Sequence, residues 1–363
     1  MSLKLVFHAE ELLKINDSEL NFCKKISKLF KPIIILDKKD VSIEDSITKK
    51  IEQIPLFEYE KNKQEIQVFL LNLSNQEDWI IFFTNDNYIF SKNNIVVLKY
   101  HFWEDLNKYK HISFTEHAKH KLLYNEFSYN YMNSIANNTN LETKFLINIF
   151  KKENIVNIID CCCGVGRHDY ILAQNGYHIT GIDISPKQIE TANMIHSHDN
   201  INYIISDVRN FRLKKRNFDA SICMWTTYNY FSQISDLKLF LNNVWEHLKN
   251  NGLMILESKN IPILDKERLY MRNKETNDIS MNLLVYKRIL GNVQNSQYFY
   301  FINEKGQKKF LLDEEFVRFY YLDELINILD NKFKLITVYG NFYGDLYNPN
   351  KSERMISVWR AVK

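Results

Sequence analysis

Short apolar runs and helical periodicities alternate along the chain, which is the pattern of an α/β protein. In the first third of the sequence, apolar runs are bounded by Asn, Asp, Lys and Ser, as β-strands usually are. We expect strands at residues 32–36, 66–73, 79–83 and 95–99, with helices at 10–29 and 43–54. These segments predict a small N-terminal α/β domain over residues 1–114, in which we find no chemical motif.

The stretch that follows combines strands, helices and a glycine turn. A helical periodicity over residues 122–151 leads into an apolar run that ends in Asp160. The next features are a turn at Gly164 and Gly166, a helix at 167–174, an apolar run ending in Asp183, and a helix start at Ser185-Pro186. This order is typical of a nucleoside site. Glycines let the backbone approach a ligand, the helix N-terminus offers free N–H groups, and the acid binds ribose hydroxyls.

The glycine turn differs from two common phosphate-binding loops. After Gly166 come Arg167, His168 and Asp169, so the third glycine of a dinucleotide-binding loop is missing. The chain also has no G-x-x-x-x-G-K-[ST] motif at this turn. We therefore expect a ligand that has a ribose but no phosphate.

The stretch from Asp160 to His168, DCCCGVGRH, resembles the first motif of the class I S-adenosylmethionine (SAM) dependent methyltransferases. Later elements of the chain follow the order of that family: residues 202–209, 218–225, 237–248, 251–257, 333–340 and 355–360. The resemblance covers residues 122–363. It implies an α/β fold with a Rossmann-like seven-stranded sheet, and with it a methyltransferase domain over residues 115–363.

Three alternating runs, at 283–289, 297–302 and 308–320, resemble the small antiparallel sheet that small-molecule enzymes of this family insert as a substrate cap. We expect this cap insertion at about residues 261–320.

The resemblance implies SAM as cofactor and S-adenosylhomocysteine as product. It assigns cofactor binding to Asp160, Cys162, Gly164, Gly166, Arg167, Asp183, Ile184, Asp207, Val208, Met224 and Tyr131. Asp183 would bind the ribose diol, Asp207 the adenine amino group, and Asp160 the SAM ammonium. Each acid also has a simpler interpretation: a helix cap for Asp183, a solvated loop acid for Asp207, and a buried structural carboxylate for Asp160.

Candidate catalytic and substrate residues follow from the same resemblance. Tyr228 and Asn229 come just after the fourth strand of the family and face the expected methyl position. His168 is either a base or a capping or packing histidine. The candidate substrate-binding residues are Glu257, Arg318 and Tyr230.

The cysteines and the overall charge indicate the cellular compartment and the kinds of partner that the protein can have. Three of the five cysteines are consecutive, Cys161 to Cys163, which does not match the spaced pairs of a zinc site. We expect no metal, and a reducing compartment. No apolar run approaches a membrane span of about 20 residues, so we expect a cytoplasmic protein. A net charge of +3 does not favour a nucleic-acid partner, and we expect no DNA and no membrane binding.

The loop after the fourth strand excludes several classes of methyltransferase. It has no Pro-Pro pair of the DNA amino-methylating enzymes, no Pro-Cys nucleophile, no glutamate pair and no metal-binding acids. Residues 224–231 are instead similar to the loop of sugar-amine and glycine N-methyltransferases. A small-molecule N- or O-methyltransferase of specialised or sugar metabolism is the leading hypothesis.

Two alternatives stay open. One is an RNA or protein methyltransferase whose N-terminal domain docks the macromolecule. The other is a non-catalytic protein that binds SAM or a partner. The N-terminal domain either packs against the catalytic domain, where it closes the cleft or supports a homodimer, or forms an independent unit.

Overall fold

A computed structural model describes five short strands within the first 98 residues, and residues 138–363 apart from 215–216, 265, 276–278 and 305–306. The chain divides into two compact units. One unit consists of Met1–Leu106, Glu267–Lys287 and Gln297–Leu312, and the other of Asn107–Lys266, Arg288–Ser296 and Asp313–Lys363. Tyr131, the expected helices at 10–29 and 43–54, and the expected strand at 66–73 lie outside the described residues.

The N-terminal strands form one parallel sheet. They are β1 (Leu3–His8), β2 (Ile33–Asp37), β3 (Leu56–Tyr59), β4 (Trp79–Phe83) and β5 (Ile95–Leu98). Their spatial order is β3-β2-β1-β4-β5, and every paired neighbour is parallel. Apolar runs predicted β2, β4 and β5, whereas β1 and β3 were not expected. The boundary at residue 114 and the role of this part of the chain remain predictions.

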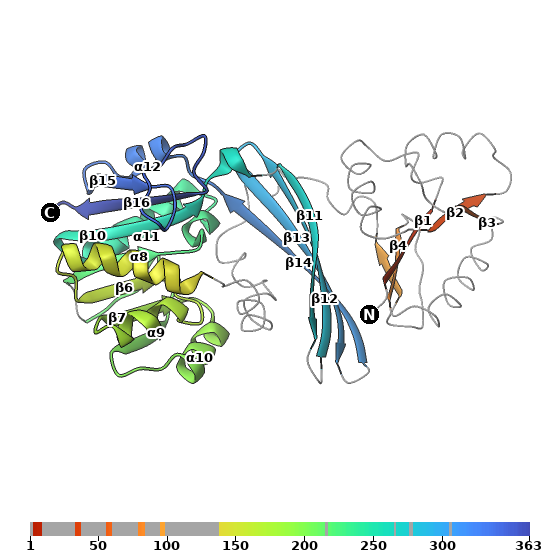
Figure 1. Ribbon diagram of the computed structural model, residues 1–363, viewed down its shortest axis with the longest axis horizontal. Helices are drawn as coiled ribbons and strands as arrows, with labels where there is room; N and C mark the ends of the chain where they lie inside the picture. The colour runs from red at the N-terminus through yellow and green to blue at the C-terminus, as the bar shows by residue number, and fades with distance from the viewer. Residues whose placement is uncertain are drawn as a thin grey trace. The chain divides into compact units, whose positions relative to one another are not determined.

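A seven-stranded sheet organises the second unit (Figure 1). Its strands are β6 (Asn157–Cys161), β7 (His178–Asp183), β8 (Ile201–Ile205), β9 (Phe218–Cys223), β10 (Leu248–Lys259), β15 (Phe333–Tyr339) and β16 (Arg354–Ala361). The spatial order is β15-β16-β10-β9-β6-β7-β8. β16 pairs antiparallel with both β15 and β10, and every other pair of neighbours in this sheet is parallel. The Rossmann-like sheet with a closing antiparallel pair is confirmed.

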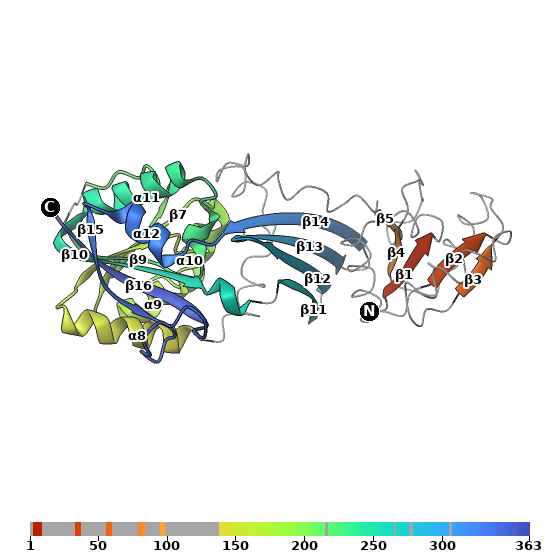
Figure 2. The same ribbon diagram turned by 90° about the horizontal axis from the view of Figure 1, so that it is seen from above.

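Helices cover both faces of this sheet (Figure 2). They are α8 (Thr139–Lys152), α9 (Arg167–Gln174), α10 (Pro186–Ile195), α11 (Ile234–His247) and α12 (Leu322–Leu329). In the part of the chain that is described, none of the helices is long and apolar enough to span a membrane.

Apolar side chains point to both faces of the seven-stranded sheet, so each face has its own hydrophobic core. Ile159, Met254 and Leu256 pack with α11 and α12, whereas Ile158 and Ile255 pack with α8 and α9. Successive side chains of a strand point to opposite faces, so each buried strand supplies both cores. The near-continuous apolar runs of the sequence reflect this two-sided burial.

The topology also determines where a ligand site can form. The central strand β6 pairs with β7 on one side and β9 on the other, so the chain order reverses at β6. Loops that leave the carboxyl ends of parallel strands at such a reversal diverge, and a crevice opens between them. The residues after Cys161, Asp183 and Cys223 all start from this edge.

A separate four-stranded antiparallel sheet lies within the residues where we expect the cap insertion. Its strands are β11 (Glu267–Glu275), β12 (Ile279–Leu290), β13 (Val293–Glu304) and β14 (Gln307–Arg318), in that spatial order. The three predicted runs correspond to β12, β13 and β14. The sequence pattern missed β11, and it also missed the helix α12 that follows β14.

We expect Phe150→Ala to lower the free energy of unfolding of the second unit by about 3–5 kcal/mol, because truncation of a buried aromatic ring leaves a cavity. Phe150 is fully buried and packs edge-on against Tyr177 at 5.5 Å between ring centroids. Urea unfolding measures the change. The control is Leu239→Ala at an exposed position of α11, which we expect to cost under about 0.5 kcal/mol. Equal losses for the two variants would contradict the core assignment.

Candidate active site

The turn after β6 is held on the neighbouring strand by its backbone. The N–H groups of Cys162 and Cys163 donate to the carbonyl oxygen of Ile182, at 2.7 and 3.1 Å. Gly164 and Gly166 have φ of +58° and +72°, and Cys162 has φ of +65°. Cys162 therefore occupies a left-handed conformation that glycine adopts without steric cost. This agrees with its place in the motif, where the family usually has glycine.

Gly166 is required for a second reason. A Cβ atom at this position would lie 1.9 Å from the hydroxyl oxygen of Tyr203, a residue of β8. The Tyr203 hydroxyl donates to the carbonyl oxygens of Gly166 and His196, at 3.4 and 3.2 Å. The Tyr203 ring thus packs against the turn, and only glycine at position 166 leaves room for its hydroxyl group.

Asp183 links the glycine turn to the following helix. Its Oδ2 accepts from the Gly164 N–H at 3.0 Å, and its Oδ1 accepts from the Ser185 N–H at 2.9 Å. Burial raises the pKa of Asp183, although these backbone hydrogen bonds oppose the shift. Ser185 in turn caps α10 by accepting from the Gln188 N–H at 3.3 Å. The carboxylate is therefore fixed at the edge of the sheet, beside the half-buried Ile184.

Asp207, after β8, is paired with an arginine. The guanidinium of Arg209 donates to both oxygens of Asp207 at 2.6–3.1 Å, and it also donates to Asp236 at 2.8 Å. These two carboxylates raise the pKa of Arg209, against the effect of its partial burial. Val208 is buried next to this pair. The side chain of Asp207 stays partly exposed beside this arginine.

A second carboxyl group accompanies Asp160. Asp160 at the end of β6 and Asp169 in α9 are both buried. Burial and the negative charge of Asp169 raise the pKa of Asp160 well above its usual range. Burial raises the pKa of Asp169 to about 7. The two groups therefore retain a proton between them near neutral pH. Asp169 was not expected to interact with Asp160.

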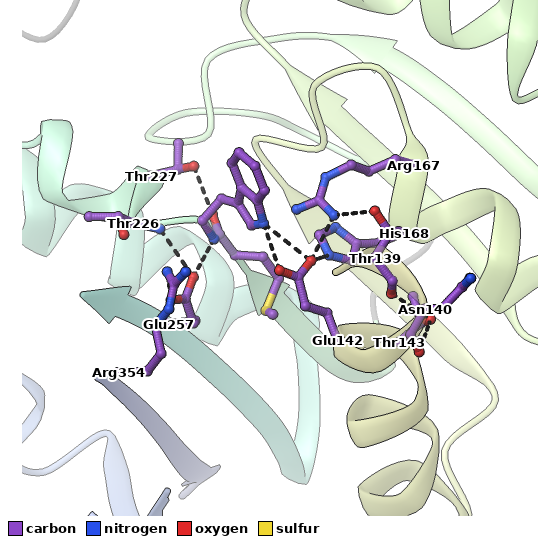
Figure 3. A network of polar contacts seen from close by, with 12 residues as sticks. Thr139, Asn140, Glu142, Thr143, Arg167, His168, Thr226, Thr227, Glu257 and Arg354 are labelled. Atoms are coloured by element: carbon purple, nitrogen blue, oxygen red, sulfur yellow. Dashed lines mark hydrogen bonds and ion pairs between the residues drawn. The ribbon is translucent and has the colours of Figure 1, made fainter. Parts of the chain in front are cut away.

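A buried glutamate connects three segments around the turn (Figure 3). Glu142 of α8 accepts from Arg167 Nη1 at 2.7 Å and contacts His168 Nε2 at 2.7 Å. The indole N–H of Trp225 donates to both of its oxygens, at 3.0 and 3.1 Å. Burial would raise the pKa of Glu142, but His168 and Arg167 outweigh it and lower this pKa to about 2.

Arg167 and His168 are both buried in this network. The Arg167 guanidinium lies 4.1 Å above the Trp225 ring and also donates to Thr139 Oγ1 at 2.7 Å. Burial and the charge of Arg167 lower the pKa of His168 to about 4. His168 is therefore neutral at pH 7, and its Nε2 is directed at Glu142. In the structure, His168 packs as a partner of Glu142.

The segment after β9 has an unusual backbone. Trp225 and Thr226 have φ of +62° and +64°, which is costly for residues with large or branched side chains. Glu257 holds this turn: its Oε2 accepts from the N–H groups of Trp225 and Thr226, at 2.5 and 3.3 Å. Its Oε1 accepts from Arg354 at 2.8 Å (Figure 3). Glu257 is fully buried, so the structure places this expected substrate residue as an anchor of the turn.

The next residues of this loop are covered by the base of β14 and the residues after it. The side-chain amide of Asn229 donates to the carbonyl oxygen of Arg318 at 2.7 Å, and the Tyr230 hydroxyl donates to Glu315 at 3.0 Å. Tyr228 stacks on Tyr320 with 6.3 Å between ring centroids. Tyr228 and Asn229 are fully buried, and burial raises the pKa of Tyr228.

Arg318 interacts with protein groups at this base. Its guanidinium donates to Glu324 at 2.9 Å and to the carbonyl oxygen of Ser232 at 3.3 Å. Met224, at the start of the same loop, is buried in the core beneath α8 and α9. The structure therefore gathers Met224, Tyr228, Asn229 and Tyr230 on one loop, with Arg318 against its far end.

The cysteines near the turn are thiols rather than disulfides. Cys161, Cys163 and Cys223 are buried, Cys162 is half-buried, and all four are free. Burial and nearby negative groups raise the pKa of the Cys163 thiol well above its usual range. A raised pKa disfavours the nucleophilic thiolate. Within the described residues, no group of three or more His, Cys, Asp or Glu side chains is arranged to hold a metal ion.

Sequence reasoning missed the residues that organise this site through distant contacts. Glu142 contacts Arg167 and Trp225, which are 25 and 83 positions away, and no local motif surrounds it. Arg354 lies 97 positions from Glu257. A buried glutamate on α8 and an arginine at the start of β16 have no signature in a single sequence.

We expect acid to destabilise the protein through His168. Its pKa is about 4 in the folded protein and about 6.5 in the unfolded chain, so the unfolded state binds more protons between these values. Stability is therefore full above pH 6.5 and declines as the pH falls toward 4. This contribution amounts to about 2 kcal/mol between pH 7 and pH 5. Urea unfolding at both pH values should show that His168→Gln loses less stability than the wild type. Identical losses would disprove the assignment.

Comparisons with known proteins agree with this architecture. Residues 158–252 match the family model described as a methyltransferase domain. The ubiquinone biosynthesis O-methyltransferase of Rickettsia akari is 26% identical over 202 residues, which cover 55% of this chain and 66% of that protein. The glycine/sarcosine N-methyltransferase of Aphanothece halophytica is 25% identical over 126 residues, covering 34% of this chain and 48% of that protein.

Solved structures show the same fold. A SAM-dependent methyltransferase from Clostridium acetobutylicum superposes with a TM-score of 0.56 at 16% identity, covering 66% of this chain and 98% of that chain. The sugar N-methyltransferase KedS8 from a Streptoalloteichus species gives 0.57 at 14% identity, covering 64% and 92%. The resemblance, the fold class and the SAM cofactor expected from the sequence are thereby confirmed. Residues 158–252 thus form a methyltransferase domain, within a fold that the chain shares with SAM-dependent methyltransferases.

Proposed function

We propose that the protein transfers the methyl group of SAM to a nitrogen or oxygen atom of a small molecule. The chain spans 40% to 66% of the length of the curated relatives it matches, so the activity and substrate of the whole protein are inferences from its site. The relatives include glycine and ubiquinone methyltransferases, and the structural neighbours include a sugar N-methyltransferase. The family thus includes both nitrogen and oxygen acceptors of modest size.

The turn after β6 has polar atoms that suit the proposed cofactor. Arg167 Nη2 and Gln188 Oε1 are buried and have no hydrogen-bond partner among the described residues. A Cβ atom at Gly164 would lie 3.7 Å from that Gln188 oxygen, so the glutamine faces the glycine turn. Asp183 would hold the ribose, Asp207 and Val208 the adenine, and Asp160 the ammonium group.

The covering of the loop after β9 is the observation that most favours a small acceptor. Tyr228 and Asn229 are fully buried beneath Arg318 and Tyr320, and the whole arrangement belongs to one compact unit. An extended macromolecule needs these residues on an open surface, whereas a small molecule needs only a closed space. When bound, SAM supplies an activated methyl group, and the protein's own residues need mainly to position the acceptor.

The state of the nearby groups favours nitrogen over oxygen as the acceptor. A hydroxyl acceptor must lose a proton to a base, whereas an amine needs only to be neutral. His168 Nε2 faces Glu142, and both oxygens of Glu257 already accept hydrogen bonds. The raised pKa of Tyr228 keeps its phenol protonated at neutral pH. These groups are arranged to orient an acceptor rather than to deprotonate it.

We expect Asp183→Ala to lose most of the affinity for SAM, because the carboxylate that would bind the ribose diol is removed. Titration calorimetry with SAM measures this loss, and we expect at least a tenfold increase in Kd. Glu246→Ala removes an exposed acid of α11 and should leave Kd unchanged. Unchanged affinity in Asp183→Ala would overturn the proposed cofactor site.

A transfer assay tests the acceptor class. Purified protein is incubated with methyl-labelled SAM and a panel of amino sugars, small amino acids, phenols and short RNA or peptide chains, with and without a chelator. We expect label in a small amine, at a rate that the chelator does not change. Transfer only to RNA or peptide, or a rate that magnesium restores after chelation, would contradict the proposal.

A further inference from the structure

We propose that the N-terminal parallel sheet carries a second ligand site at the carboxyl ends of β1 and β2, where Asp37 binds the ribose hydroxyls of a nucleoside that lacks phosphate. This site is distinct from the one around the glycine turn, and it goes beyond the proposed methyl transfer. Three features of the chain support it: the order of the strands, the position of Asp37 in that order, and the sequence around it.

The N-terminal sheet repeats the strand order of the methyltransferase sheet. Its strands lie in the order β3-β2-β1-β4-β5 (Figure 2), and the parallel strands of the other sheet lie in the order β8-β7-β6-β9-β10. In both sheets the first strand of the chain is central, the next two lie on one side of it, and the following two lie on the other. All of these neighbours are parallel. β1 thus has the place of β6, and β2 has the place of β7.

The chain order therefore reverses at β1 as it does at β6. In open parallel sheets, the connections on the two sides of such a reversal run over opposite faces, and ligands bind at the carboxyl ends of the strands there. The registers show which residues reach this edge. His8, the last residue of β1, pairs with Ile35 of β2, and Phe7 pairs with Phe83, the last residue of β4. The carboxyl ends of β1, β2 and β4 therefore lie together.

Asp37 has the same topological position as Asp183. Asp183 is the last residue of β7, and Asp37 is the last residue of β2. Asp37 lies two residues beyond the register partner of His8, and it pairs with Tyr59, the last residue of β3. An acid after the second strand of such a sheet binds ribose hydroxyls. The topology thus brings an acid, a histidine and a tyrosine to one edge of three neighbouring strands.

The ionisable residues of the five N-terminal strands are concentrated at this edge. His8, Asp37, Glu58 and Tyr59 occupy the last or second-to-last position of their strands, and the amino ends carry only Lys4. All other positions within these strands are apolar, as is typical of parallel strands buried on both faces. Both ends of a strand approach the surface, so burial alone does not explain this asymmetry. A ligand at the carboxyl edge does.

The sequence beside this edge argues against a phosphate on the ligand. No glycine occurs before Gly164, so the residues after β1 cannot supply the glycine-rich turn that holds a phosphate. His8 is followed by Ala9, Glu10 and Glu11, and two glutamates repel an anion. A neutral ligand with vicinal hydroxyls fits better. Two sources share this chemistry: a free nucleoside, and the adenosyl group of a second cofactor molecule.

Calorimetry on the full-length protein tests the proposal and separates the two sources. The site at the glycine turn is filled with S-adenosylhomocysteine, and each of the four ribonucleosides is titrated beside its 2′-deoxy form and its 5′-monophosphate. We expect a ribonucleoside to bind at least tenfold more tightly than its 2′-deoxy form, because a hydroxyl bonded to a carboxylate is lost. The monophosphate should bind no more tightly than the nucleoside. Two equivalents of S-adenosylhomocysteine per chain would instead identify the adenosyl group as the source.

Variants assign the second site to Asp37. Asp37→Ala should abolish nucleoside binding, or reduce two equivalents of S-adenosylhomocysteine to one, and Asp37→Asn should retain part of the affinity. Asp17→Ala changes an acid of the same unit outside the five described strands, and should have no effect. Asp183→Ala should weaken the site at the glycine turn and leave the second site intact.

Four results overturn the proposal. They are one equivalent of S-adenosylhomocysteine with no nucleoside bound to the saturated protein, equal binding of ribonucleosides and 2′-deoxynucleosides, tighter binding of a monophosphate, and binding that Asp37→Ala leaves unchanged. The wild-type titrations need no variant, so they decide the matter even if Asp37→Ala fails to fold. A wild type that binds no S-adenosylhomocysteine would overturn the proposed function, and the nucleoside titrations would still decide whether the N-terminal site exists.

Discussion

The buried carboxylate of Glu142 is the constraint on which the arrangement of this site depends. One side chain of α8 holds Arg167 and His168 at the start of α9 and the indole of Trp225 after β9. Removing one partner of a buried ion pair destabilises a protein by about 3–5 kcal/mol, because the remaining buried charge has neither a counter-ion nor water to stabilise it. The network therefore has to form as a whole. Its formation fixes the glycine turn relative to the loop that is expected to receive the acceptor.

Backbone strain in the same region has a matching explanation. Cys162, Trp225 and Thr226 all adopt left-handed conformations without being glycine. The strain at Trp225 and Thr226 is balanced by Glu257, which accepts from both N–H groups and is itself held by Arg354. Strained conformations persist only where surrounding contacts determine them, and they are concentrated at functional sites. Two buried acids thus fix this turn. Glu142 holds the side chain of Trp225, and Glu257 holds the backbone N–H groups of Trp225 and Thr226.

The sequence predicted the parts of the site that are local and missed the parts that are distant. The glycine turn, Asp183 and the serine cap of α10 lie within one strand–turn–helix–strand unit, where spacing alone indicates geometry. Glu257 and His168 were recognised as relevant positions, but their partners were not. Each partner comes from an element that only the folded sheet brings close, so a single sequence gives no sign of these contacts. β11 was missed because its apolar residues do not alternate with polar ones, and α12 was missed although Leu322, Leu325 and Leu329 have helical spacing.

The reversal of chain order at β6 explains why charged groups gather here at all. The residues after β6, β7 and β9 diverge from one edge, and α8 and Arg354 close that edge from the two ends of the domain's sequence. Acidic side chains that enter such a crevice meet N–H groups, arginines and an indole rather than water. Glu142 and Glu257 each gain an arginine, whereas Asp160 has Asp169 beside it and keeps a proton in the pair. A cation bound beside Asp160 would therefore favour the ionised form of this carboxyl group, whereas the arginines already keep Glu142 and Glu257 ionised.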